Sequence, residues 1–119
     1  ELKVSINTAK EVWPNRELLI VFQPHRYSRT KALFDDFVRL LSSCKNLILL
    51  EVYPASEKPI PNYESDDLIR EIHKSNPSAK LVRGIEEAYD AMKEIAEENF
   101  IFLTQGAGNT SLLAKKFKN

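Results

Sequence analysis

The sequence has a single cysteine, Cys44, among its 119 residues. One thiol excludes an internal disulfide, so the core alone must hold the fold, and such a chain suits a reducing compartment. The sequence also has only 2 histidines, and no His, Cys or carboxylate residues stand at the short spacings of a metal-binding motif. We therefore expect neither a disulfide nor a metal site.

Long apolar runs and an excess of charge of either sign are also missing. No apolar run approaches the roughly 18 residues that a membrane-spanning helix needs, and the N-terminus does not resemble a signal peptide. The chain has 17 basic and 17 acidic residues, which gives a formal net charge of zero. A neutral chain creates no general field for nucleic acid or anionic membrane, so any anion site must come from a local cluster. We expect a cytoplasmic protein whose partners include neither nucleic acid nor membrane.

What the sequence does contain is an alternation of strand and helix patterns. Short, continuous apolar runs predict buried strands at residues 18–22, 47–52 and 100–104. Residues 80–82 are a weaker strand candidate. Helical periodicity separates these runs, which indicates a mostly parallel sheet with helices on both faces. The predicted fold is one three-layer, Rossmann-like α/β domain over residues 1–119.

Apolar residues at helical spacing predict the helices between these strands. The first helix ends at Pro14, the second occupies the stretch that starts at Thr30, the third begins at Ser65, and Gly84 opens the fourth; a short final helix is expected after residue 109. The residues predicted to face the core are Leu2, Ile6, Ala9 and Trp13, then Leu33, Phe37, Leu40 and Leu41, then Leu68, Ile69 and Ile72, then Ile85, Ala88, Met92 and Ile95. The first helix has no N-cap before it, so we expect the chain to be part of a longer protein.

The stretch most informative about function is residues 22–29, FQPHRYSR. It links the first predicted strand to the second predicted helix, and α/β folds bind ligands at such turns. Arg26 and Arg29 share a helix face if the helix begins near Ser28. Because a helix N-terminus carries partial positive charge, two guanidinium groups there destabilise it unless an anion is bound. We favour a site for a carboxylate or phosphate, with His25 beside it, over two ordinary surface arginines.

Further candidates are expected at the same edge of the sheet. Tyr53 and Glu57 flank the end of the second strand, where a structural Tyr and a solvated Glu are the simpler interpretation. Gly106, Gly108 and Asn109 form a turn whose backbone N–H groups can approach an anion, although a plain turn fits equally well. We treat these five residues as candidates for a nucleotide-binding or domain-interface edge. No Gly-x-x-x-x-Gly-Lys-Ser/Thr loop occurs, so the usual cradle for a nucleoside triphosphate is missing.

Four stretches together resemble a known family: residues 21–30 (VFQPHRYSRT), Asp36-Phe37, residues 51–60 (EVYPASEKPI) and residues 105–109 (QGAGN). They are similar, in order and in register, to the C-terminal domain of the UDP-N-acetylmuramate–L-alanine ligases, members of the Mur ligase family. The resemblance runs along nearly the whole chain, and its FQPHRYxR part is specific. Ser28 and Asn109 stand where these ligases often have Thr and Asp, which are mild changes.

The resemblance implies a cytoplasmic three-domain enzyme of peptidoglycan synthesis, in which a UDP-sugar domain and a central P-loop domain precede this one. ATP and Mg²⁺, bound mainly by the central domain, would activate the carboxylate of UDP-N-acetylmuramate as an acyl phosphate, which the amino group of L-alanine attacks. Arg26 and Arg29 would hold the carboxylate of alanine or of the product, with His25 in the same motif. Residues 106–109 would lie near the nucleotide or a domain interface.

The family's acidic-aromatic-His-Pro motif stands just before the point at which this chain begins. We therefore expect no catalytic residue, no cofactor and no activity in this chain by itself. The alternative is a stand-alone α/β module that binds a small carboxylated or phosphorylated ligand. A receiver domain is disfavoured, because no cluster of carboxylates follows a predicted strand.

Overall fold

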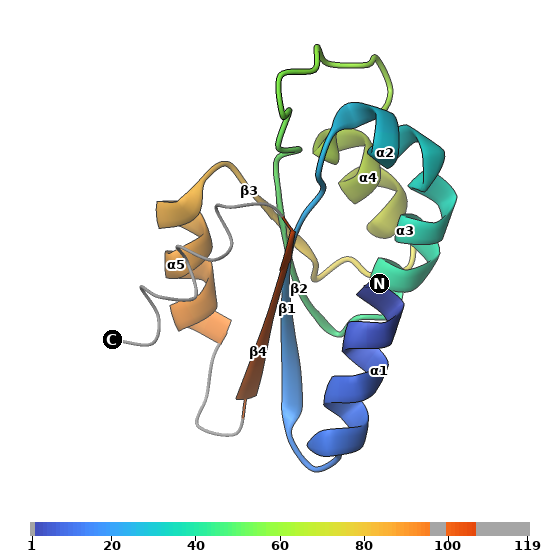
Figure 1. The fold of residues 1–119 in the computed structure, drawn as a ribbon. Helices are drawn as coiled ribbons and strands as arrows, with labels where there is room; N and C mark the ends of the chain where they lie inside the picture. The colour runs from blue at the N-terminus through green and yellow to red at the C-terminus, as the bar shows by residue number, and fades with distance from the viewer. Residues whose placement is uncertain (1, 96–99, 107–119) are drawn as a thin grey trace.

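A parallel sheet of four strands forms the centre of the computed structural model, which describes residues 2–95 and 100–106 (Figure 1). The strands are β1 (Glu17–Gln23), β2 (Asn46–Leu50), β3 (Lys80–Val82) and β4 (Phe100–Gly106). Their order is β3-β2-β1-β4, and each neighbouring pair is parallel. All four predicted strands are thus confirmed. Because the strands are parallel, their carboxyl ends share one edge of the sheet, to which the predicted site belongs.

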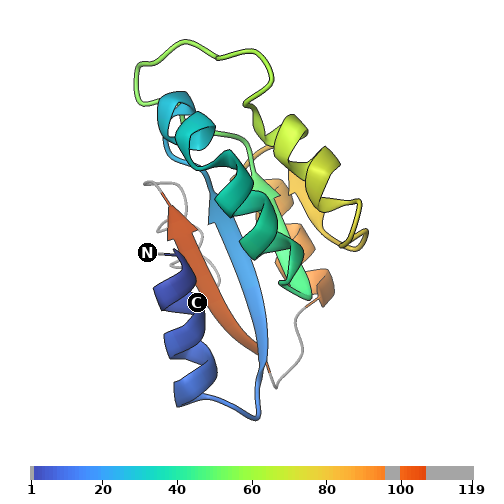
Figure 2. The ribbon, with the colours of Figure 1, turned by 90° about the vertical axis from the view of Figure 1, so that its right-hand side faces the viewer.

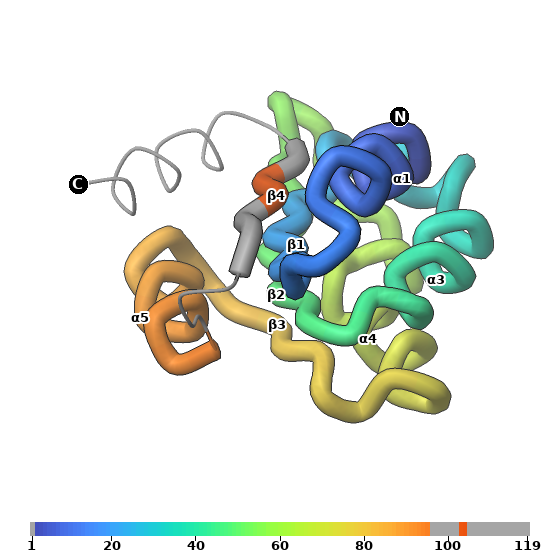
Figure 3. The backbone as a smooth tube through the Cα atoms, turned by 90° about the horizontal axis from the view of Figure 1, so that it is seen from below, coloured from blue at the N-terminus to red at the C-terminus, as the bar shows by residue number. Residues whose placement is uncertain are grey.

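Helices cover both faces of this sheet, as the sequence predicts. They are α1 (Leu2–Val12), α2 (Tyr27–Ala32), α3 (Phe34–Ser42), α4 (Ser65–Ile72) and α5 (Ile85–Ile95). Figure 2 looks onto the face covered by α1, α3 and α4, and Figure 3 shows that, of the described helices, α5 covers the opposite face. None of the described helices is long and apolar enough to cross a membrane. The α/β prediction is confirmed.

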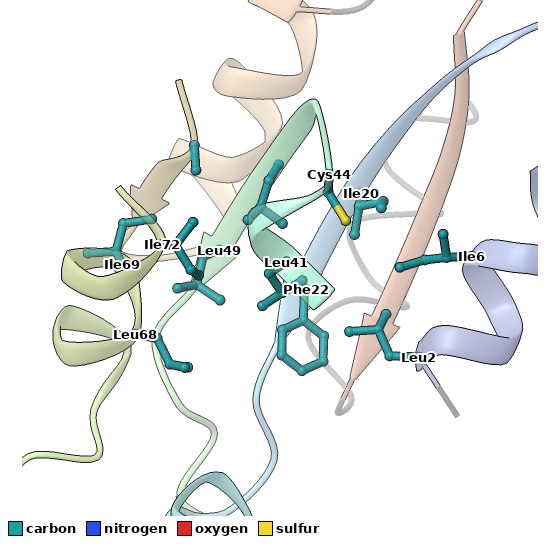
Figure 4. Packing of buried hydrophobic residues seen from close by; sticks show 12 residues of the cluster. Leu2, Ile6, Ile20, Phe22, Leu41, Cys44, Leu49, Leu68, Ile69 and Ile72 are labelled. Atoms are coloured by element: carbon teal, nitrogen blue, oxygen red, sulfur yellow. The ribbon is translucent and has the colours of Figure 1, made fainter. Parts of the chain in front are cut away.

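Alternate residues of the strands divide the core between the two faces. On the face of α1, α3 and α4, Ile20 and Phe22 pack with Leu41, Leu49 and other buried residues, several of which are shown in Figure 4. On the face of α5, the strand residues in between pack against that helix; this second cluster comprises Leu19, Val21, Ile48, Leu50, Val82, Ala88, Ala91 and Met92. Burial of one such Leu, Ile or Met side chain stabilises the fold by roughly 1.5–3 kcal/mol. Two-sided burial explains why β1 and β2 have continuous apolar sequences.

The structure departs from the predicted helices at three places. Trp13 is 44% exposed and lies outside α1, which ends at Val12 before the chain turns toward β1. The helix predicted after β1 is two helices, because Leu33, with φ −111° and ψ 14°, breaks the helical backbone. Glu64, not Ser65, is the N-cap of α4. The Ser65 hydroxyl instead donates to the carbonyl oxygen of Leu50 at 2.6 Å, which ties α4 to the end of β2.

Candidate functional site

The predicted site begins where β1 ends, and there the chain pairs with the segment that follows β2. The backbone N–H of Tyr53 donates to the carbonyl oxygen of Pro24, and that of Arg26 donates to the carbonyl oxygen of Tyr53, both at 2.8 Å. These bonds make an isolated parallel bridge between His25 and Tyr53. Their rings are stacked, with centroids 5.7 Å apart and planes at 25°. The structure therefore places Tyr53 beside His25, although the two residues are far apart in the sequence.

Arg26 has an unusual backbone conformation. It is the N-cap of α2, and its φ of 71° and ψ of 144° lie in a region that residues with a side chain rarely adopt. α2 begins at Tyr27, next to the predicted start at Ser28, but Arg26 precedes it, so the expectation that Arg26 and Arg29 share a face of this helix is wrong. The carbonyl oxygen of Arg26 accepts two hydrogen bonds from Thr30, which is fully buried. Backbone bonds on both sides thus hold Arg26 in a strained conformation.

Glu57 caps the start of α2 from a distant part of the chain. One of its carboxylate oxygens accepts the backbone N–H of Ser28 at 2.9 Å, and the other accepts the Ser28 hydroxyl at 2.6 Å. These two bonds, with a contribution from the charge of Arg26, hold the pKa of Glu57 below its ordinary value of 4.5. The chain thus supplies a carboxylate of its own to this turn, while the binding of a ligand's carboxylate or phosphate by the two arginines stays a prediction.

The charged side chains of this turn face the solvent. Arg26 and Arg29 are both exposed, while His25 is half-buried. The first turn of α2 contains no acidic residue. Two guanidinium groups and one imidazole are thus concentrated on a single turn at the carboxyl edge of the sheet, in addition to the carboxylate of Glu57 that binds Ser28. Such a turn suits a ligand that carries a carboxylate or a phosphate, because guanidinium groups bind both with charge-assisted hydrogen bonds.

Of the predicted glycine-rich turn, Gly106 lies within the described residues. β4 continues through Gln105 and Gly106, where Gly106 pairs with Gln23 of β1. The predicted strand ends too early, because pairing with β1 extends the strand into residues that the sequence assigns to a turn. Gly106 therefore lies at the same edge as His25. Gly108 and Asn109, like the predicted final helix, lie outside the described residues.

A cavity of about 340 Å³ opens beside this turn, over the carboxyl ends of β1 and β2, and Gln23, Tyr27 and Tyr53 contribute to its wall. Asp66 and Arg83 also line it, and Arg83 donates to both oxygens of Asp66, at 3.0 and 2.9 Å. These bonds hold the pKa of Asp66 below its ordinary value. Among the residues that the structure describes, no three His, Cys, Asp or Glu side chains are grouped so that they could hold a metal ion.

Comparison with known proteins identifies the family. Residues 1–108 match the family model described as Mur ligase, glutamate ligase domain. The chain belongs to the Mur ligase family. Among solved structures, it is similar to the UDP-N-acetylmuramate-alanine ligase MurC from Thermotoga maritima, with 27% sequence identity and a TM-score of 0.63. That match covers 95% of this chain and 22% of the other, so the chain spans about a fifth of that protein's length. The family resemblance found in the sequence is thus confirmed.

The structure of this Mur ligase domain adds residues that sequence reasoning missed. Ser28 and Thr30 fix the backbone of residues 25–29, which we call the arginine turn, and the sequence offers only a weak signal for either. Thr30 stands four residues after Arg26, a spacing at which a Thr hydroxyl reaches a preceding carbonyl oxygen. The pairing of Ser28 with Glu57 spans 29 residues and depends on the course of the loop between β2 and α4.

Proposed function

We propose that this chain is the amino-acid-binding domain of an ATP-dependent Mur ligase that joins L-alanine to UDP-N-acetylmuramate in peptidoglycan synthesis. Membership of the Mur ligase family supports the class of enzyme, and the likeness to an alanine ligase of 27% identity supports the choice of amino acid. On this proposal the enzyme works in the cytoplasm. Its UDP-sugar and central domains belong to other parts of the same protein, and this domain closes over them.

The observation that carries the proposal is the turn at residues 25–29, where Arg26 and Arg29 are both exposed at the carboxyl edge of the sheet. An amino acid presents one carboxylate, which two guanidinium groups can bind with charge-assisted hydrogen bonds. Held in this way, the amino acid keeps its amino group free to point toward an acyl donor. The backbone of Arg26 is held by hydrogen bonds with Tyr53 and Thr30, which favours such binding, because less conformational freedom is lost when the ligand arrives.

The proposed division of labour assigns no catalytic step to this chain. ATP and Mg²⁺, bound by the central domain, would supply the activation of the muramoyl carboxylate. The side chains of Arg26 and Arg29 would bind and orient the amino acid, and the half-buried His25, stacked on Tyr53, would line the same site. Tyr53, Gly106, Gly108 and Asn109 remain candidates for the edge that meets the nucleotide or the central domain. By itself the chain would be inactive.

Substitution of either arginine in the complete ligase tests the proposal. Arg26→Ala or Arg29→Ala removes a charge-assisted contact that domain closure buries, which we expect to be worth roughly 2–4 kcal/mol. The KM for alanine should then rise, or kcat/KM fall, by about 30- to 1000-fold. The KM for ATP should change much less, because this contact concerns the amino acid. Steady-state kinetics with each substrate varied in turn measures both effects.

Arg39 offers a matched control, since it is an exposed arginine on α3 that pairs with Asp36 at 3.0 Å. Arg39→Ala should leave both KM values unchanged. The assay should also compare L-alanine with glycine, L-serine and L-glutamate, because a carboxylate contact alone does not select a side chain. Wild-type kinetics in both Arg26→Ala and Arg29→Ala would contradict the proposed binding role. A strong preference for L-glutamate would contradict the choice of alanine.

A further inference from the structure

Helix α2 starts without a capping bond from its own N-cap residue. It has six residues, no acidic residue in its first turn, and an N-cap, Arg26, whose side chain makes no capping bond. The first N–H groups of a helix have no partner within the helix and need one from elsewhere. At this turn the N–H groups that lack a partner within the helix lie close to the positive charge of two arginines. α2 therefore depends on a negative group from another part of the fold.

Glu57 meets that need from the loop between β2 and α4. Its two oxygens bind the N–H and the hydroxyl of Ser28 at 2.9 and 2.6 Å. Hydrogen bonds to an ionised carboxylate are short and about twice as strong as neutral ones. Both oxygens bind the same residue, so the carboxylate fixes not only the position but also the orientation of the first turn of α2.

The same loop also fixes the backbone of Arg26. We call residues 53–57 the clamp loop. At its start the carbonyl oxygen of Tyr53 accepts a hydrogen bond from the N–H of Arg26 at 2.8 Å. At its end the N–H of Glu57 donates to the carbonyl oxygen of Pro54 at 3.0 Å. This second bond closes a compact turn in which Ala55 has a φ of 50°. The clamp loop therefore binds the arginine turn at two places, through the carbonyl oxygen of Tyr53 and through the carboxylate of Glu57.

We propose that Glu57 is a positioning residue, which orients the guanidinium groups of Arg26 and Arg29 by fixing the first turn of α2. The inference rests on the proposed function, since it concerns how those two arginines are held for the amino-acid carboxylate. The carboxylate of Glu57 is engaged by Ser28, so this role accounts for it better than contact with a nucleotide. A small displacement of a group that positions the substrate lowers the reaction rate strongly, so a residue that fixes this group has a large effect on the reaction.

Two substitutions in the complete ligase separate the charge of Glu57 from its shape. Glu57→Ala removes both bonds to Ser28, and we expect the KM for the amino acid to rise about 10- to 100-fold, a loss typical of a displaced binding group. Glu57→Gln keeps an oxygen that can accept the N–H of Ser28, so its effect should be smaller. The KM for ATP should stay within about twofold in both variants. A parallel rise of both KM values would overturn the inference in favour of general destabilisation.

A double-mutant cycle tests whether Glu57 acts through Arg26. In an Arg26→Ala background, Glu57→Ala should raise the amino-acid KM by a smaller factor than in the wild-type background, because one of the two groups that it positions is already gone. Strictly additive effects on the amino-acid KM would overturn the inference. Glu94→Gln is the matched control, since Glu94 forms an exposed ion pair with Lys80 at 3.1 Å; it should leave the kinetics unchanged.

Amide hydrogen exchange of the same variants reports on the turn directly. In Glu57→Ala the N–H of Ser28 loses its acceptor and should exchange faster, while amides in β1 should keep their protection. Unchanged exchange at Ser28 would overturn the inference. If Arg26→Ala raises the amino-acid KM but Glu57→Ala does not, only the positioning role fails. If Arg26→Ala and Arg29→Ala both leave that KM unchanged, the proposed function fails and the positioning role fails with it.

Discussion

Thr30 and Arg26 are joined twice, because the backbone N–H and the hydroxyl of Thr30 both donate to the carbonyl oxygen of Arg26, at 3.1 and 2.7 Å. Thr30 has no exposed surface, so water cannot replace the bond of its hydroxyl. The strained backbone of the exposed Arg26 is thus held by two hydrogen bonds from the buried Thr30. This arrangement leads to two predictions about the stability of the chain.

Thr30→Val keeps the shape of the side chain and removes its hydroxyl. We expect the free energy of unfolding to fall by about 1 kcal/mol, the usual net contribution of one hydrogen bond. Urea denaturation measures the change. Thr8→Val provides the control, because Thr8 is exposed on α1 and its substitution should change stability by less than about 0.5 kcal/mol. Equal effects at the two positions would show that the Thr30 hydroxyl contributes little.

Arg26→Gly and Arg26→Ala remove the same guanidinium group but differ in the backbone. Because residue 26 has a φ of 71°, glycine adopts its conformation without strain and alanine does not. We expect the glycine variant to be the more stable of the two by roughly 1 kcal/mol, measured by urea or thermal unfolding. Two variants of the same stability would mean that residue 26 relaxes out of this conformation when the arginine is lost.

The lowered pKa values of Glu57 and Asp66 predict how stability depends on pH. A carboxyl group whose pKa is lower in the folded chain than in the unfolded chain stabilises the fold above its unfolded pKa, and this contribution is lost as pH falls through the folded value. The ordinary values are 4.5 for Glu57 and 3.8 for Asp66. Stability should therefore start to fall below about pH 4.5 and continue to fall at lower pH.

Glu57→Gln isolates one of the two contributions, since the amide does not titrate. Urea midpoints measured between pH 7 and pH 3 should depend less on pH in this variant than in the wild type. Asp66→Asn should flatten the lower part of the same range, because its carboxylate is paired with Arg83. Curves for Glu57→Gln and the wild type that run parallel throughout would contradict the assignment for Glu57.

The chain by itself should bind Mg-ATP negligibly. No Gly-x-x-x-x-Gly-Lys-Ser/Thr loop occurs in its sequence, and the backbone N–H groups of one glycine-rich turn do not replace that cradle. Titration calorimetry should detect no binding near micromolar affinity. A tight, saturable isotherm would show that this domain holds a nucleotide site of its own.

The strands could be predicted from the sequence because β1 and β2 are buried on both faces, which requires continuous apolar runs. Helix boundaries were harder, since the helical periodicity of apolar residues continues through Leu33, where the backbone breaks. The cap of α4 shows a second reason. Ser65 is a good capping residue, but its hydroxyl binds the carbonyl oxygen of Leu50, and this tertiary contact shifts the cap to Glu64.

For the candidate site, the sequence identified the charged residues but not the contacts that arrange them. His25, Arg26 and Arg29 could be found because they are close together and follow a clear strand. The bond between Glu57 and Ser28 joins residues 29 positions apart, and no local pattern encodes it. The positive φ of Arg26 has the same origin, since it is imposed by pairing with Tyr53 and not by any preference of arginine.

The strand order has a consequence for how the chain folds. β1 lies between β2 and β4, and its neighbour β4 begins only at Phe100, after β2 and β3 in the sequence and far from the end of β1 at Gln23. Closing so long a loop is slow, and it delays pairing between distant strands. During synthesis, one edge of β1 therefore stays open until β4 has left the ribosome. An open apolar edge is prone to pair with other chains, so chaperone binding in this interval would protect the nascent domain from aggregation.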